Sequence, residues 1–168
     1  MINLRKILLT TLLVGGSLMG WAVNPKPFVV PELTQWQGGE GQMRPSGKLV
    51  VLSSALRPTA ETFCRDFALL TGRQMSIATY TKPKAGDIVL RLKKDKALGS
   101  EGYRMAIGTE CELTAPTVRG LYWGLQTVLQ LSKQQPELPC GQTVDVPRYA
   151  TRGFMLDVGR KFIPMPYL

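Results

Sequence analysis

The sequence contains no histidine among its 168 residues. Histidine is the commonest metal ligand and the commonest general base near neutral pH, so its absence removes both roles. A zinc protease of the HExxH kind is excluded, because that motif needs two histidines. We therefore expect no metal and no cofactor.

Cysteine is also scarce, and Cys64, Cys111 and Cys140 lie far apart with no CxxC pair. This spacing argues against zinc-binding and thioredoxin-like functions. In an exported protein the three thiols allow one disulfide and one free cysteine. The alternative is three unpaired and mostly buried thiols. The sequence does not choose between these arrangements.

Acidic residues are few: the sequence has 12 Asp and Glu against 21 Lys and Arg. The formal net charge is therefore +9. Such an excess is found in proteins that bind nucleic acid or anionic surfaces. Here the basic residues are scattered, and the densest cluster, Lys93–Lys96, contains Asp95. No aromatic RNA-binding signature accompanies it. We interpret the charge as that of an ordinary basic exported protein and predict no nucleic-acid partner.

The first 22 residues have the pattern of a secretory signal peptide. Arg5 and Lys6 precede a mostly apolar core, Ile7–Leu18, and Gly20-Trp21-Ala22 supplies small residues at the two positions a signal peptidase needs. A short membrane anchor is the alternative, but the apolar core is too short to span a bilayer comfortably. We predict a signal peptide over residues 1–22, a periplasmic or secreted protein, and no stable membrane insertion after cleavage.

Short strand patterns and two helical patterns fill residues 23–147. Apolar residues at helical spacing predict helices over 59–71 and 117–133, the first ended by Gly72 and the second capped by Thr114 or Thr117. Strands are predicted over 27–31, 49–52, 74–80, 87–93, 103–108 and 111–115, with a weak strand or ordered loop over 33–45 and a polar loop over 134–141. This order predicts an α+β fold, with a mostly antiparallel sheet and two helices on one face.

Two glycines, Gly120 and Gly124, lie four residues apart inside the second predicted helix. Each glycine costs about 1 kcal/mol of helix stability relative to alanine. Their presence together indicates that this helix lies close against the sheet.

The stretch RGFMLDVGRKFIP, Arg152–Pro164, follows the small domain. Its continuous apolar run is typical of a strand buried on both faces, as in a parallel sheet or a barrel. Gly159 and two cations follow the run, and Pro164-Met165-Pro166 has the composition of a helix start. The sequence therefore predicts the beginning of a strand–loop–helix unit.

Three motifs in the chain resemble those of the β-N-acetylhexosaminidases of glycoside hydrolase family 20. They are Gly99-x-Glu101-Gly102-Tyr103, then Gly120-Leu121-Tyr122-Trp123-Gly124-Leu125-Gln126-Thr127-Val128, and finally Pro147-Arg148 with Arg152–Arg160. The resemblance implies a family N-terminal α+β domain of the zincin-like layer type over 23–147. It also implies the first strand and first helix start of a truncated (β/α)8 catalytic barrel over 148–168.

The resemblance implies hydrolysis of terminal β-linked N-acetylglucosamine or N-acetylgalactosamine with retention, the substrate's own acetamido oxygen acting as nucleophile. It assigns Arg160 to the hydroxyls of the terminal sugar, a role suited to a planar fork of donors at the C-terminal end of a barrel strand. Arg152 and Asp157 match the pattern as structural residues. Lys161 departs from the family, which often has histidine there.

The family's catalytic Asp-Glu pair has no counterpart, because the sequence contains no Asp-Glu dipeptide. We expect that pair beyond the chain end and predict no catalytic residue within the chain and no hydrolysis by the chain alone. It is then a fragment, a prematurely ended reading frame or a partial gene model. The alternatives are a carbohydrate-binding or interaction module that has lost its barrel, or a glycosidase with a similar leading domain, such as an α-glucuronidase or an O-GlcNAcase-like enzyme.

Overall fold

The computed structural model describes residues 22–157, 159 and 162–167, so most of the predicted signal peptide lies outside it. The strands are β1 (Gln37–Met43), β2 (Lys48–Val51), β3 (Ser76–Thr79), β4 (Ile88–Leu92), β5 (Tyr103–Ile107), β6 (Cys111–Ala115) and β7 (Leu138–Asp145), and the α-helices are α2 (Arg57–Thr71) and α3 (Val118–Gln134). Short 3-10 helices cover Ser54–Leu56, Lys96–Leu98 and Met165–Tyr167. No helix in the described ranges is long and apolar enough to cross a membrane.

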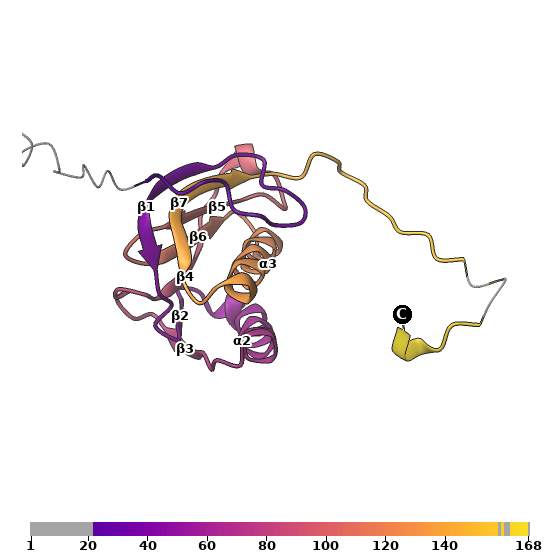
Figure 1. The fold of residues 1–168 in the computed structure, drawn as a ribbon, viewed down its shortest axis with the longest axis horizontal. Helices are drawn as coiled ribbons and strands as arrows, with labels where there is room; N and C mark the ends of the chain where they lie inside the picture. Colours follow the sequence, from indigo (N-terminus) through magenta and orange to yellow (C-terminus); the bar gives the residue numbers. More distant parts are fainter. Residues whose placement is uncertain (1–21, 158, 160–161, 168) are drawn as a thin grey trace, which may run out of the picture.

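All seven strands form one sheet in the order β1-β7-β5-β6-β4-β2-β3. Neighbours from β1 to β6 pair antiparallel, and neighbours from β6 to β3 pair parallel. Both α-helices lie on the same face of this sheet (Figure 1). The α+β prediction with two helices on one face is confirmed, and the structure adds that the antiparallel strands occupy one half of the sheet.

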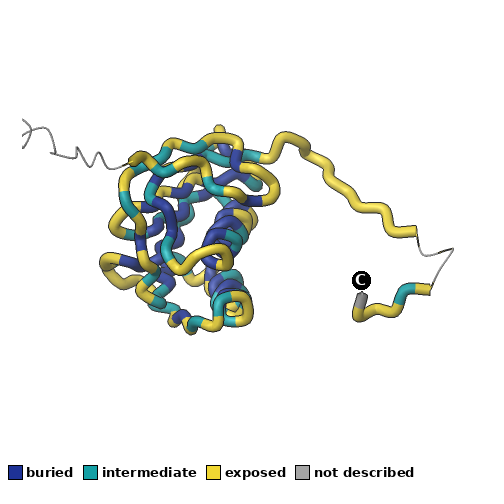
Figure 2. The backbone as a smooth tube through the Cα atoms, in the orientation of Figure 1, coloured by how far each residue is buried: buried dark blue, intermediate teal, exposed yellow. Residues whose placement is uncertain are grey.

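The two helices share a face because each one joins strands that run in the same direction. The helix α2 connects β2 to its parallel neighbour β3, and α3 connects β6 to β7 across the intervening β5. A crossover of this kind packs its apolar stripe back onto the sheet. The core therefore lies between the helices and one sheet face, where the dark blue residues gather in Figure 2.

The strand β5 shows how sequence alternation sets this core. Tyr103, Met105 and Ile107 are buried toward the helices, whereas Arg104 and Ala106 are exposed on the other face. This alternation follows from the period of two along a strand, and the predicted hairpin of β5 and β6 is confirmed. The predicted helices are also confirmed, but Leu70 and Tyr122 at the edges of their apolar stripes are exposed.

The glycines of α3 allow this helix to pack close against the sheet, as the sequence predicts. A Cβ atom at position 120 would lie 2.5 Å from the Gly102 carbonyl oxygen, and one at Gly124 would lie 2.8 Å from a Leu113 methyl carbon. Carbon atoms do not tolerate such contacts, so both glycines let the helix axis approach the sheet. Thr117 caps the helix, its hydroxyl accepting a hydrogen bond from the Gly120 N–H.

Two predicted elements are corrected. The run Pro27–Pro31 forms no strand; instead, the Gln130 side chain on α3 bonds both the N–H and the C=O of Val30, each at 2.8 Å. The predicted loop over 134–141 contains the start of β7. At Pro139 the strand β7 pairs only with β1, because β5 pairs with β7 from Gly141 onward, and proline is tolerated where a strand has a free edge.

Candidate functional site

The segment after β7 runs out from the domain as an extended chain. Arg160 and Lys161 lie outside the described residues, so their predicted roles stay predictions. Residues 152–157 form no strand and are exposed, with Phe154 at 87% and Met155 at 90%. The barrel strand expected over this stretch therefore stays a prediction, since the described residues 152–157 pair with no other described strand. The predicted helix start is a 3-10 turn, Met165–Tyr167.

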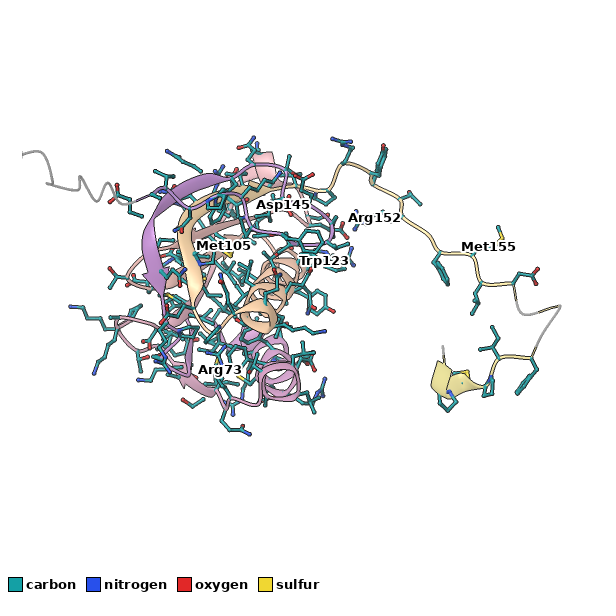
Figure 3. The ribbon with its side chains drawn as sticks, in the orientation of Figure 1. Arg73, Met105, Trp123, Asp145, Arg152 and Met155 are labelled. Atoms are coloured by element: carbon teal, nitrogen blue, oxygen red, sulfur yellow. The ribbon has the colours of Figure 1, made fainter. Side chains whose placement is uncertain are left out.

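The side chain of Arg152 joins this segment to the folded domain. Its Nη2 donates to the Glu101 carboxylate at 2.5 Å, and its Nη1 donates to the Tyr149 carbonyl at 2.8 Å. In Figure 3, Arg152 lies beside the body of the domain, while Met155 stands well away from it. The structural role predicted for Arg152 corresponds to this ion pair with Glu101, which ties the segment after β7 to the domain at that point. Asp157 is exposed and accepts a hydrogen bond from the nearby Gly159 N–H.

Glu101 is held in place by a loop packed tightly against the start of α3. Its side chain is 18% exposed and also receives Arg119 Nη1 at 3.4 Å. Behind it, the Thr117 hydroxyl donates to the Ser100 carbonyl at 2.6 Å. A Cβ at Gly102 would lie 2.4 Å from the Leu98 carbonyl oxygen, so this position requires glycine. The loop therefore holds the Glu101 carboxylate in position to bind Arg152 of the segment that follows β7.

The two arginines change the proton affinity of Glu101. The hydrogen bond from Arg152 is the main cause that lowers the pKa of the Glu101 carboxyl below its ordinary value of 4.5, with burial opposing and the charges of Arg152 and Arg119 adding to the effect. Because the charged form is favoured in the folded protein, the pair is present above pH 4.5. It is lost only as the pH falls through the lowered pKa.

We therefore expect the Glu101–Arg152 contact to persist at pH 4.5 and to break at lower pH. A carbon-13 NMR titration of the Glu101 carboxyl, read together with the Arg152 guanidinium signal, measures the midpoint. The Glu101→Gln variant is the control, because its Arg152 signal should be that of an unpaired arginine at every pH. A shared midpoint at or above 4.5 would contradict the pairing.

The face of the sheet opposite the helices has a second feature, an open hollow over β1, β7, β5 and β6. It has a volume of about 820 Å³ and is lined mainly by polar side chains and glycines. Gln37, Gln142 and Arg104 are exposed within it, and Glu112 is half-buried. No sequence motif indicated this surface, because its residues come from four separate strands.

The described side chains supply little else for catalysis. Cys64, Cys111 and Cys140 form no disulfide. Burial raises the pKa of all three thiols, that of Cys111 to about 12, so they are protonated and weak nucleophiles at neutral pH. Within the described ranges, no group of three or more potential metal ligands comes together. The observed geometry is suited to binding and positioning.

Sequence reasoning identified Glu101 and Arg152 within motifs but did not pair them. They are 51 residues apart, and opposite charges at that separation leave no periodic signal. The only sequence cue is that Glu101 is followed by Gly102, in a loop whose glycines permit close packing.

Comparison with known proteins gives consistent matches. The model of glycosyl hydrolase family 20, domain 2, matches residues 26–146. A β-hexosaminidase of Akkermansia muciniphila is 40% identical over 72 residues, which cover 40% of this chain and 15% of that protein. A β-N-acetylhexosaminidase of Cellulomonas fimi is 34% identical over 99 residues, covering 55% of this chain and 20% of that protein.

Solved structures give the same result for the fold. A Streptomyces plicatus β-hexosaminidase variant, solved in complex with its product GlcNAc, is 29% identical with a TM-score of 0.71. The match covers 84% of this chain and 30% of that one. A Streptomyces coelicolor β-N-acetylhexosaminidase is 27% identical with a TM-score of 0.69, and the match covers 84% of this chain and 31% of that one. The chain thus spans less than a third of these relatives.

Proposed function

Because the chain belongs to glycoside hydrolase family 20, we propose that it is the N-terminal domain and first catalytic segment of an exported β-N-acetylhexosaminidase. The observation that supports this most is the match of the family's domain model to residues 26–146, over a fold with two helices on one sheet face. Export rests on the signal-peptide pattern of residues 1–22.

The proposed reaction removes a terminal β-linked N-acetylglucosamine or N-acetylgalactosamine from an oligosaccharide. It proceeds with retention, and the substrate's acetamido oxygen attacks the anomeric carbon. A relative of similar fold was solved with GlcNAc as its product, which supports this substrate class. Arg160 contributes a sugar-binding guanidinium at the start of the catalytic domain.

In this proposal the described domain positions the catalytic segment. The Glu101–Arg152 ion pair holds the chain eight residues before Arg160. The domain itself supplies no acid pair, since the sequence has no Asp-Glu dipeptide for orienting an acetamide and protonating a leaving group. We therefore propose that this chain alone is inactive.

The test compares two polypeptides on a chromogenic N-acetylglucosaminide. One is the 168-residue chain, and the other continues from Leu168 into the barrel of the Streptomyces plicatus relative. We expect hydrolysis from the longer polypeptide only. Turnover by the short chain would refute its inactivity. A folded longer polypeptide with no turnover would argue against the proposed catalytic role of the family segment.

A further inference from the structure

The hollow on the helix-free face is large enough to hold a small ligand. Its volume of about 820 Å³ lies within the roughly 300–1,000 Å³ common for ligand pockets. In Figure 1 the helices cover the opposite face, and the C-terminal segment leaves from the side where α3 lies.

Strand register places the polar groups of the hollow in a straight row. Gln37 pairs with Gln142, Gln142 with Ala106, and Ala106 with Glu112, so these side chains share one face across β1, β7, β5 and β6. Adjacent strands lie about 4.8 Å apart, which makes the row about 14 Å long. That length exceeds a single sugar ring and suits a short, extended chain.

The charges around the row are already neutralised by partners within the protein. Arg104 donates to Asp95 through two nitrogens, at 3.0 and 2.9 Å, and Arg91 donates to Glu112 at 3.0 Å. Glu110 also lines the hollow and adds a negative charge. The net positive charge of the chain is therefore not concentrated here, and a phosphate-rich or other polyanionic ligand is disfavoured.

What remains available is a set of neutral donors and acceptors. The side-chain amides of Gln37 and Gln142 have no recorded hydrogen bond to any described residue, and both side chains are exposed. Each amide offers two N–H donors and an acceptor oxygen. Adjacent hydroxyls of a sugar, each both donor and acceptor, complement such groups, whereas an apolar ligand would leave them unpaired.

A fixed aromatic ring, that of Trp36, supports the hollow from the core side of the sheet. The Trp36 indole N–H donates to the Asn24 carbonyl at 3.2 Å, which orients the ring. A Cβ at Gly141 would lie 2.4 Å from Trp36 Cζ2, so a glycine is needed for the ring to occupy this place. The half-buried indole packs against the core, so it covers this part of the sheet on the helix side and leaves the amides of Gln37 and Gln142 exposed on the other side.

We propose that this hollow binds a neutral oligosaccharide along the row Gln37–Gln142–Ala106–Glu112. It is a binding site on the N-terminal domain, and it holds a glycan chain against that domain. The proposal does not depend on the catalytic barrel, because every group that it uses lies between Trp36 and Gln142.

The test is an NMR titration of the 168-residue chain with three oligosaccharides of matched length. The probes are N-acetylchitotetraose, cellotetraose and a sulfated, heparin-derived tetrasaccharide. We expect saturable shifts at the amides of Gln37, Gln142 and Ala106 with at least one neutral probe. A Gln37→Ala/Gln142→Ala variant should weaken that binding at least about fivefold, because it removes two neutral hydrogen-bonding groups. The matched control is Gln74→Ala, an exposed glutamine outside the hollow, and it should leave the affinity unchanged.

Four results would overturn the proposal. They are no saturable shift with either neutral probe, shifts confined to the helix face, equal binding by the double variant, and binding of the sulfated probe alone. Shifts at the hollow that depend on protein concentration without sugar would assign the surface to a second copy of the chain. Thermal unfolding of each variant checks that the exposed substitutions leave the fold intact.

Discussion

Replacing Arg160 by alanine is expected to lower kcat/KM for a chromogenic N-acetylglucosaminide by about 100-fold or more, because each charge-assisted hydrogen bond contributes about 1.5–3 kcal/mol and the guanidinium offers two to adjacent hydroxyls. The measurement uses the polypeptide that continues from Leu168 into the Streptomyces plicatus barrel. Arg160→Lys should recover little of the loss, because an ammonium lacks the planar fork of donors.

The matched control for this prediction is Arg148→Ala, which removes an exposed arginine from the same segment. It should leave kcat/KM within about twofold, because an exposed side chain away from structural features contributes little. If Arg160→Ala and Arg148→Ala have equal, small effects, Arg160 is a surface residue and its assignment to the sugar is wrong. An unchanged thermal transition in both variants separates lost binding from lost folding.

The sequence predicted those elements whose periodicity is strong over several turns or strand residues. The helix α3 has an apolar stripe, a threonine cap and two helix-interior glycines that agree with one another, and its predicted bounds differ from those observed by one residue. The strand β7 was missed over its first residues because Pro139 and Gly141 have the composition of a loop. Tertiary pairing with β1 and β5 overrides that local preference.

The candidate sites depend on contacts that a single sequence does not record. Glu101 meets Arg152 only because the loop before β5 packs against α3, and Gln37 meets Gln142 only through strand register. The stretch around Phe154 has the pattern of a buried strand, yet its side chains are exposed here. The apolar pattern of a segment indicates that it can form a buried strand. It does not indicate which other strand supplies the backbone hydrogen bonds.

The second large effect is expected in the core, at Phe67 on α2. Its side chain is 1% exposed, and its ring lies 5.8 Å from that of Phe63. Arg73 covers the ring with its Cζ atom 4.9 Å from the centroid. The Arg73 Nη1 donates to the Pro136 carbonyl at 3.0 Å, while its Nη2 is buried with no hydrogen-bond partner among the described residues. The Arg73 guanidinium therefore lies over the Phe67 ring.

Phe67→Ala is expected to lower the free energy of unfolding by about 3–5 kcal/mol for the lost burial and the cavity, plus about 1 kcal/mol for the cation–π contact. Phe63→Ala is the matched control, because Phe63 lies on the same helix, is 2% exposed and has no recorded cation over its ring. Urea unfolding of both variants should therefore show the larger loss for Phe67. Since small domains are stable by only about 5–15 kcal/mol, the milder Phe67→Leu gives a second measurement if the alanine variant does not fold.

A double-mutant cycle with Arg73→Met separates the two contributions. The Arg73→Met variant has no guanidinium over the Phe67 ring. In that background, the loss of unfolding free energy from Phe67→Ala should therefore be nearly equal to that from Phe63→Ala. The packing cost should remain in both backgrounds, because the cavity is the same. An extra cost that survives the loss of Arg73 would mean that the difference between the two phenylalanines comes from packing alone.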